Sequence, residues 1–533
     1  MRKRILVITL LSVILISSVS YYVYGAIPAE ERATLIAFYN ASDGDKWEDN
    51  SGWKEGETEW DGFGPIGSEG DWYGITVLND HVTGIEFKIV KGTIPPDFGN
   101  LSKLETLTIK LKKLEDDIPS ELGNLNYLKK LQLVAMHGEH RIPRTLGNLT
   151  MLEELTLDSP DLSGPIPSEL GNLVNLKVLV LGAPYRVVEA LNPKADLSKL
   201  KASDLKGGLL SGNIPPELGN LSKLETFILQ NQDLNSTIPP EMGNLTNLKK
   251  LVLKECGLIG NIPPELGNLS SLEELDLRMN RLTGSIPAEL GDLGQLKILF
   301  LDWNQLKGGI PPELGNLRNL ENLSLSNNHL EDSIPPELGN CTSLLYLWLQ
   351  NNRLNGNIPR ELGNLIKLQQ LMLNSNQFRG TIPLYLANFS VYLIGVSYNG
   401  FYAGLDTPER VLKRLKSDWA DTQTIAPNKV KALPISSTSV RVSWEPIAYK
   451  EDTGRYIILY GTSYRGPWTE AGTTNNKSAG TFDVTDLRPG TKYYFVVQTQ
   501  TDPHKKNQNL LVSEFSKYVS AIPGNATPRG YKE

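Results

Sequence analysis

The chain has 533 residues, of which 40% are hydrophobic and 21% charged, and its formal net charge is −7. Basic and acidic residues are interspersed rather than gathered in blocks, which argues against a nucleic-acid-binding surface. The composition is that of a folded protein exposed to solvent.

The first 25 residues predict export from the cytoplasm. Residues 2–4 are basic, residues 5–24 are mostly apolar, and Gly25 and Ala26 supply small residues where a signal sequence is cleaved. An apolar run of about 20 residues is also long enough to cross a bilayer as an uncleaved anchor. We therefore expect residues 1–25 to be a signal peptide or, as the alternative, an N-terminal membrane anchor. In both cases the rest of the protein is secreted or lies at the cell surface.

Residues 26–81 predict a cap for the segment that follows. Residues 29–41 place Leu35, Phe38 and Tyr39 on one side of a helix. Four of the nine Trp residues then cluster in a Gly- and Asp-rich stretch, at positions 47, 53, 60 and 72. Such a cluster fits either an aromatic sugar-binding site or a cover for the open hydrophobic end of a repeat array. Because a repeat array follows, we favour the cover.

The array is marked by an Ile-Pro pair that recurs every 24 residues or, once, at twice that spacing. The Ile residues stand at positions 94, 118, 142, 166, 214, 238, 262, 286, 310, 334, 358 and 382. A fixed period of this length is typical of a solenoid, whose copies stack side by side. With Ile as position 1, Leu-x-Leu at positions 14 and 16 predicts short strands that pair into a parallel sheet. Pro at position 2 begins a helical turn on the opposite, convex side, and we expect Gly at position 6 to end it.

The template, Leu-x-x-Leu-x-x-Leu-x-Leu-x-x-Asn-x-Leu-x-Gly-x-Ile-Pro-x-x-Leu-Gly, resembles the plant-specific class of leucine-rich repeat over residues 82–405. The preceding Glu-Arg-x-x-Leu, Phe-Tyr and Trp cluster resembles the N-terminal cap of leucine-rich-repeat proteins. It lacks the cysteine pair that plant members carry, which favours a prokaryotic relative. The resemblance implies an α/β leucine-rich-repeat solenoid that binds a protein, peptide or glycan ligand.

The copies differ at position 19. The C-terminal copies have Asn there, at residues 280, 304, 328, 352, 376 and, with one residue lost, 399. An Asn side chain can satisfy the turning backbone between copies, so we expect less regular turns in the N-terminal half, where other residues stand. Residues 190–213 have lost Ile-Pro but keep Leu197, Leu200, Leu205 and Leu210 in phase. We interpret this segment as a diverged copy; the alternative is a specialised loop around residues 185–194.

The two cysteines, Cys256 and Cys341, occupy different template positions four copies apart. At ~4.8 Å per stacked strand their separation is on the order of 19 Å, which is too far for a disulfide. We expect both thiols to be free.

Binding by a solenoid uses the concave sheet, where template positions 13, 15, 17 and 18 are expected to point outward. Most of these residues are polar. In the copies that begin at residues 286, 334 and 358, however, six are apolar, and we predict them to be the ligand-binding residues: Ile298, Phe300, Trp303, Tyr346, Trp348 and Met372. Two alternatives are that the C-terminal domain covers these side chains or that strands simply favour aromatic residues. A weaker patch comprises Val178, Val180, Ile228 and Val252.

Catalytic chemistry is hard to find in the sequence. His137 and His140 flank one Glu, a weak metal motif, and we interpret both as surface histidines. No Ser-His-Asp grouping, nucleotide-binding loop or kinase signature is visible in the sequence. We expect a protein that is not an enzyme and has no catalytic residue, metal site or cofactor.

The period changes from 24 to 2 near the C-terminus. Residues 406–426 predict a C-terminal cap and linker, with a short amphipathic helix at 407–418. Alternating strands at 440–444, 456–460, 480–484 and 493–497 predict an all-β sandwich. Trp444, Tyr456 and the segment ending at Tyr493 resemble the core Trp, core Tyr and tyrosine corner of a fibronectin type III domain, which we place at residues 427–523. Residues 524–533 form a tail.

Together these patterns predict an exported recognition protein. Its ligand is a protein, peptide or glycan, and nucleic acid is not expected as a partner. Contact with a membrane is expected only through an uncleaved N-terminal anchor. The alternative is a structural element of the cell surface or matrix with no defined ligand.

Overall fold

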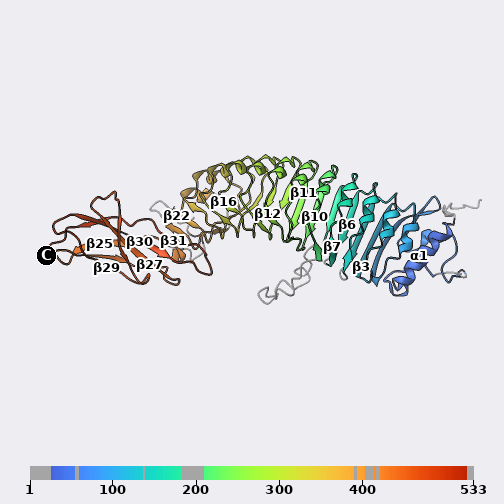
Figure 1. Cartoon of the computed structure of the whole chain (residues 1–533), viewed down its shortest axis with the longest axis horizontal. Helices are drawn as coiled ribbons and strands as arrows, with labels where there is room; N and C mark the ends of the chain where they lie inside the picture. Colours follow the sequence, from blue (N-terminus) through green and yellow to red (C-terminus); the bar gives the residue numbers. More distant parts are fainter. Residues whose placement is uncertain are drawn as a thin grey trace, which may run out of the picture.

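The computed structural model is elongated, with helix α1 near one end and a β-sandwich at the other (Figure 1). It describes residues 26–54, 59, 61–135, 139–159, 161–182, 209–388, 393–402, 413, 415 and 420–524. The predicted signal peptide or anchor, most of the predicted helix at 407–418, Trp60, His137 and residues 185–194 lie outside this part. No helix among the described residues is long and apolar enough to cross a bilayer.

The N-terminal region is a cap built on aromatic packing. Helix α1 (Ala29–Ala41) is followed by short 3-10 turns η1 (Gly44–Lys46) and η2 (Glu69–Asp71) and by strands β1 (Ile75–Leu78) and β2 (His81–Gly92). Trp47, Trp53 and Trp72 are buried. The Trp53 ring centre lies 5.4 Å from that of Trp47 and 4.6 Å from that of Trp72, and the Trp47 ring centre lies 4.7 Å from that of Phe87 on β2. These rings have no face left for a sugar, so the predicted cover is confirmed for these three Trp residues.

The repeats form one 14-stranded sheet, here called the concave sheet. β1 and β2 are antiparallel, and every later strand is parallel to its neighbours, with equivalent Leu residues of successive copies in register. The parallel strands after β2 are β3 (Thr106–Leu114), β4 (Lys130–Ala135), β6 (Glu154–Asp158), β8 (Val178–Leu181), β10 (Thr226–Gln230), β11 (Lys250–Lys254), β13 (Glu274–Asp276), β15 (Ile298–Phe300), β17 (Asn322–Ser324), β19 (Tyr346–Trp348), β21 (Gln370–Met372) and β23 (Leu393–Gly395). The Leu residues of each strand point into a continuous core.

The opposite, convex side consists of short 3-10 turns that begin after the Pro at template position 2. These are η3 (Pro96–Asn100), η4 (Ser120–Asn124), η5 (Arg144–Asn148), η6 (Ser168–Asn172), η9 (Pro216–Asn220), η10 (Pro240–Asn244), η11 (Pro264–Asn268), η12 (Ala288–Asp292), η13 (Pro312–Asn316), η14 (Pro336–Asn340), η15 (Arg360–Asn364) and η16 (Leu384–Asn388). The expectation that Gly at position 6 ends the turn is wrong, because the turn continues for one more residue. Gly is needed there for close packing: a Cβ on Gly267 would lie 2.4 Å from the carbonyl oxygen of Glu289 in the next copy.

Small parallel sheets join the copies between the concave strands and the convex turns. They comprise β5 (His140–Arg141), β7 (Leu162–Pro165) and β9 (Leu209–Ser211); β12 (Ile259–Asn261) and β14 (Arg281–Thr283); β16 (Lys307–Gly308) and β18 (His329–Leu330); and β20 (Asn355–Gly356), β22 (Gln377–Thr381) and β24 (Gly400–Tyr402).

The Asn residues at template position 19 form a buried ladder of hydrogen bonds. Asn280 Oδ1 accepts from the backbone N–H groups of Cys256 and Leu258, both at 3.0 Å, and Nδ2 donates to the carbonyl oxygens of Leu253 and Leu277 at 2.7 and 2.9 Å. Equivalent bonds recur at residues 304, 328, 352, 376 and 399. The ladder turns the chain just after the strand, so the concave strands from β13 to β23 have three residues each, whereas those from β2 to β11 have four to twelve. This difference confirms the predicted contrast between the two halves.

The interpretation of residues 190–213 as a diverged copy of the concave strand is wrong. β8 pairs directly with β10, with Val178 opposite Thr226 and Val180 opposite Ile228. Because these strands hydrogen-bond each other, there is no place between them for a strand of another copy. Only the end of the segment follows the template, where β9 pairs with β7. Residues 183–208 lie outside the described part.

Both cysteines are free and buried, as predicted. Cys256 stands at template position 19, and its Sγ donates to the carbonyl oxygen of Leu229 at 3.0 Å, the same type of bond that the ladder Asn residues make. Burial raises the pKa of both thiols, that of Cys341 to about 12. These residues therefore serve the fold rather than redox chemistry.

The C-terminal domain is a β-sandwich. One sheet contains β25 (Asn428–Pro434), β26 (Val440–Glu445) and β29 (Thr481–Val484); the other contains β27 (Gly454–Gly461), β28 (Thr469–Thr473), β30 (Tyr493–Thr501), β31 (Leu511–Val512) and β32 (Val519–Ala521). The Trp444 and Tyr456 rings meet in the core with centres 5.0 Å apart. Tyr493 accepts a hydrogen bond at its hydroxyl from the Arg488 N–H at 3.1 Å, which confirms the predicted tyrosine corner.

The loop between β30 and β31 joins the sandwich to the last repeats. Asn507 donates to the carbonyl oxygens of Asn376 and Tyr398 at 3.2 and 3.0 Å, and Asn509 donates to that of Asn352 at 2.6 Å. These carbonyls belong to the ridge where the chain turns after the concave strands. The linker adds η17 (Ala420–Thr422), and the sandwich extends beyond the end of the solenoid (Figure 1).

Candidate ligand-binding site on the concave sheet

Three aromatic side chains form the centre of the candidate site. Phe300 on β15 and Trp348 on β19 occupy the same template position two strands apart, with Ser324 on β17 in register between them. Strands two apart are separated by about 9.6 Å, yet the two ring centres lie only 6.3 Å apart, with an interplanar angle of 17°. The rings therefore lean toward each other over Ser324, which is 2% exposed. Tyr346 packs beside Trp348 with its ring centre 5.6 Å away.

Hydrogen bonds to the next copy fix the orientation of these rings. Trp348 Nε1 donates to Gln370 Oε1 at 3.0 Å, and the Tyr346 hydroxyl donates to Gln369 Oε1 at 3.1 Å. Met372 follows Trp348 in register on β21. Its side chain lies over Gly395, where an added Cβ would come within 2.9 Å of Met372 Cε. The result is a row of partly exposed apolar side chains whose positions are already set.

The other two predicted residues lie differently. Ile298 is partly exposed on β15 and stands in register with Asn322, which pairs in turn with Tyr346. Trp303 stands on the ridge after β15 at φ 56° and is 57% exposed. In the described part of the chain its ring contacts no other aromatic ring. The structure thus brings Ile298, Phe300, Tyr346, Trp348 and Met372 onto one surface, here called the aromatic stripe, and places Trp303 outside it.

Within the described residues, the sandwich makes no hydrogen bond to the side chains of the stripe. Its hydrogen bonds to the solenoid use the ridge, through Asn352, Ser375, Asn376, Gln377 and Tyr398. Among the described residues, none of the stripe side chains makes a hydrogen bond or ring contact with the sandwich. The alternative in which the C-terminal domain covers these side chains is therefore not supported.

Charged residues line the N-terminal side of the stripe. Asp276 on β13 binds Arg278 through Nε and Nη2, with the shortest contact at 2.7 Å. The Arg278 guanidinium lies 4.4 Å from the centre of the Phe300 ring. Asp276 is 2% exposed. The expectation that every residue at template position 15 is exposed is wrong here and at Thr108, Val252 and Ser324, which are also buried. Val252 therefore does not contribute to the weaker patch.

Asp302, two residues after Phe300, has an unusual environment. Burial raises the pKa of its carboxyl group, while a hydrogen bond from Ser324 and the charge of Arg278 oppose this shift. Its Oδ1 atom is shielded from solvent and has no hydrogen-bond partner. Asp276, Arg278 and Asp302 were not predicted as site residues, because the prediction considered only apolar side chains. The available signal was that template positions 15 and 17 bear charges next to the aromatic residues.

A row of ion pairs follows the edge of the sheet at template position 12. Glu and Lys alternate from copy to copy, and the pairs Glu105–Lys129, Glu153–Lys177, Glu225–Lys249 and Glu273–Lys297 have N–O distances of 2.6–2.8 Å. The alternation continues across the β8–β10 contact and ends at Glu321, after which Leu345 and Gln369 take the position. The ion-pair row therefore ends before β19, the strand that carries Tyr346 and Trp348 of the aromatic stripe.

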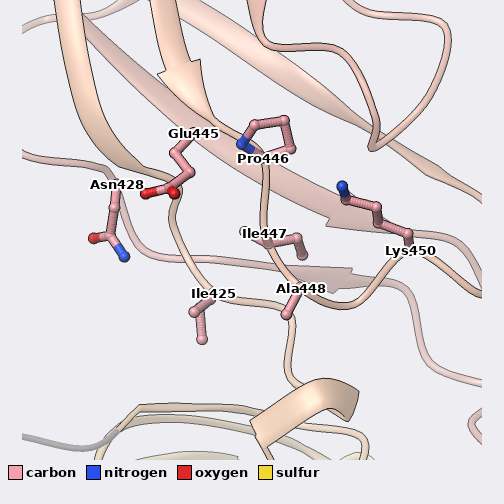
Figure 2. Close-up of a pocket in the computed structure, with 7 residues that line it drawn as sticks. All are labelled: Ile425, Asn428, Glu445, Pro446, Ile447, Ala448 and Lys450. Atoms are coloured by element: carbon pink, nitrogen blue, oxygen red, sulfur yellow. The ribbon is translucent and has the colours of Figure 1, made fainter.

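Other candidate sites are weaker. A hollow of about 390 Å³ lies where the linker meets the sandwich, and Figure 2 shows Glu445 and Asn428 on one side of it and Lys450 on the other. These groups do not converge on a common point. The interpretation of His140 as a surface histidine is wrong, because its side chain is buried. No group of three or more His, Cys, Asp or Glu side chains that could hold a metal ion occurs within the described residues.

Comparison with protein families agrees with this architecture. The leucine-rich repeat region model matches residues 88–201 and 195–309, and a second leucine-rich repeat model matches residues 319–341 and 343–365. The chain belongs to the leucine-rich-repeat family. The fibronectin type III domain model matches residues 425–510, so this leucine-rich-repeat protein carries a C-terminal fibronectin type III domain.

Solved structures include similar leucine-rich-repeat proteins. A TDR receptor is 30% identical over 64% of this chain and 54% of its own, with a TM-score of 0.52. The Arabidopsis receptor kinase HAESA, solved in complex with the peptide hormone IDA and the co-receptor SERK1, is 26% identical over 73% of this chain and 61% of its own, with a TM-score of 0.57. The chain thus spans a little more than half the length of these two proteins.

Proposed function

We propose that this protein recognises a protein or peptide ligand through the aromatic stripe on its concave sheet. The observation that carries the proposal is the cluster of Phe300, Tyr346 and Trp348, which remains partly exposed although its rings are fixed by packing and hydrogen bonds. Aromatic side chains held in this way bury much area on binding and lose little conformational freedom. The solved complex of HAESA with a peptide hormone supports the choice of ligand class.

The proposed role is recognition rather than catalysis. The stripe combines aromatic and aliphatic side chains with amide groups, and nothing in this set supplies a nucleophile with an adjacent base. The apolar segment at residues 5–24 and the resemblance to receptor proteins support a location outside the cytoplasm, either secreted or at the cell surface.

The proposal is tested by capturing partners from the extracellular fraction of the source culture with the full chain and measuring their affinity for variants. Phe300→Ala and Trp348→Ala should each weaken binding by about 30-fold or more, which corresponds to an interface hot spot of ~2 kcal/mol. Both residues lie on the surface of the sheet, so these variants should keep the fold.

Ile366→Ala is the matched control, because Ile366 is an exposed apolar residue outside the stripe. Its affinity should equal that of the unmodified protein. If Phe300→Ala and Trp348→Ala also bind all captured partners normally, the stripe is not the binding site. That result would favour a structural role at the cell surface.

A further inference from the structure

On the N-terminal side of the stripe, over strands β11 to β15, the charges are balanced except at one residue. On strands β11 to β15 and the adjoining turns, Lys250 pairs with Glu274 at 2.8 Å, Lys254 with Glu255 at 3.0 Å, and Arg278 with Asp276 at 2.7 Å. Asp302 takes part in no ion pair within the described part of the chain. The surface next to Phe300 therefore carries one negative charge without a matching cation.

Arg278 does not neutralise this charge. Its guanidinium is bound by three hydrogen bonds to Asp276 and lies against the Phe300 ring. Asp276, Arg278 and Asp302 together keep a net charge of −1. An ionised carboxylate that is shielded from water without a full set of donors is costly, and a site that retains one gains when a ligand supplies the missing donor.

Other polar atoms close to this surface also lack a hydrogen-bond donor. Besides Asp302 Oδ1, three side-chain oxygens are shielded and have no hydrogen-bond partner in the described part of the chain: Asn322 Oδ1 on β17, Gln350 Oε1 two residues after β19 and Asn374 Oδ1 two residues after β21. All four atoms are acceptors. Neighbouring aromatic rings also attract cations, most strongly when Trp is present. Acceptors and rings on one surface suit a ligand group that is both a donor and positively charged.

We propose that the aromatic stripe binds a peptide segment that carries an arginine or lysine side chain, and that Asp302 receives this cation. The inference rests on the proposed function and specifies its ligand. The aliphatic part of the arginine or lysine side chain would lie along the stripe, and its charged end would donate to the carboxylate of Asp302, a residue that is partly exposed. Arginine is favoured over lysine because its planar guanidinium can stack on the rings while it donates.

A random-peptide display library selected on the full chain tests the proposal. Peptides selected on the unmodified protein should share a basic residue. Asp302→Asn keeps the size of the side chain and removes its charge. It should lower the affinity for these peptides by about 10- to 100-fold, which is the effect of losing one hydrogen bond to a charged group. Replacing the shared arginine by citrulline, which is neutral and similar in shape, should cost the same factor. In the Asp302→Asn variant, replacing arginine by citrulline should cause almost no further loss of affinity.

The matched control is Glu321→Gln, which removes one exposed negative charge from the edge of β17. It should leave binding within about twofold, because an exposed charge at that distance is screened by salt. An equal loss on Glu321→Gln and Asp302→Asn would mean that only net charge is sensed and would overturn the assignment of Asp302.

Two other results overturn the proposal and can be told apart. If selected peptides require Trp348 but show no basic residue, or bind Asp302→Asn normally, the inference about the cation fails and the proposed function stands. If no selected peptide depends on Phe300 or Trp348, both fail. Circular dichroism and denaturation of each variant establish that the fold is intact.

Discussion

The two halves of the concave sheet share one backbone pattern but present different chemistry to solvent. From β3 to β15, Glu and Lys alternate along template position 12 and neutralise each other from copy to copy. From β15 to β21, the row of charges gives way to Phe300, Tyr346, Trp348 and Met372, with amide groups between them. Since the template is the same in both halves, the difference lies in the positions that the template leaves free.

The comparison separates residues that hold the solenoid together from residues available to a ligand. Exposed ion pairs contribute little to stability and keep a long surface soluble. Partly exposed aromatic rings contribute less to folding than buried ones, and a contiguous group of them marks an interaction surface. The half that carries the rings also carries the complete Asn ladder and the shortest strands, so its surface is presented on the more regular backbone.

The largest expected effect concerns the ladder that supports the aromatic half. Asn304→Ala removes the acceptor of the Leu282 N–H and the donor to the carbonyl oxygens of Leu277 and Leu301, each at 3.0 Å. We expect a loss of about 3 kcal/mol in local stability, because buried backbone groups lose their partners. Hydrogen exchange of β13 and β15 measures it. Asn327 is partly exposed, so Asn327→Ala should lower the local stability far less. Equal losses of stability in the two variants would refute the role of the ladder.

A substitution of Asp302 is expected to change stability by a smaller amount, and to increase it rather than lower it. Because burial raises the pKa of this carboxyl group, the native state holds its proton to higher pH than the unfolded state does. Stability therefore falls as pH rises from the ordinary Asp value of 3.8 through the raised value. Asp302→Asn should stabilise the protein at neutral pH, by on the order of 1 kcal/mol, and this gain should vanish at pH below 3.8. Urea denaturation at pH 7 and pH 3.5 measures both; destabilisation at pH 7 would contradict the account.

The smallest effect is expected in the half with the ion pairs. Lys249→Ala removes the partner of Glu225, but both side chains are exposed to solvent, so the midpoint of denaturation should not change measurably at physiological salt. Ligand affinity should also be unchanged. A loss of affinity comparable to that of Trp348→Ala would show that the ligand uses this half as well, and the contrast between the halves would fail.

Much of the fold was predictable because the period of 24 fixes the orientation of each residue. The Leu positions, the free cysteines, the Asn ladder and the tyrosine corner at Tyr493 all follow from local rules that repeat or are strongly constrained. Residues 190–213 were misread, because Leu residues in phase do not show whether a segment enters the sheet. That outcome depends on the pairing of β8 with β10, a contact between residues 48 positions apart.

The site was predictable only in part. Spacing placed Phe300, Tyr346 and Trp348 on the concave face, but it could not show that two rings would lean over Ser324 or that Trp303 would stand on the ridge. Those outcomes depend on the size of neighbouring side chains. The lack of an ion pair at Asp302 could not be predicted for the same reason, because it depends on the binding of Arg278 to Asp276 instead. Pairwise contacts between copies, rather than the template, decide such details.

The most direct test of the central claim is hydrogen–deuterium exchange of the full chain with and without a captured ligand. Slower exchange should be confined to β15, β17, β19 and β21 and the turns that follow them, with no change in β4, β6 and β8. Protection confined to the strands with ion pairs, to the convex turns or to the fibronectin type III domain would contradict the account.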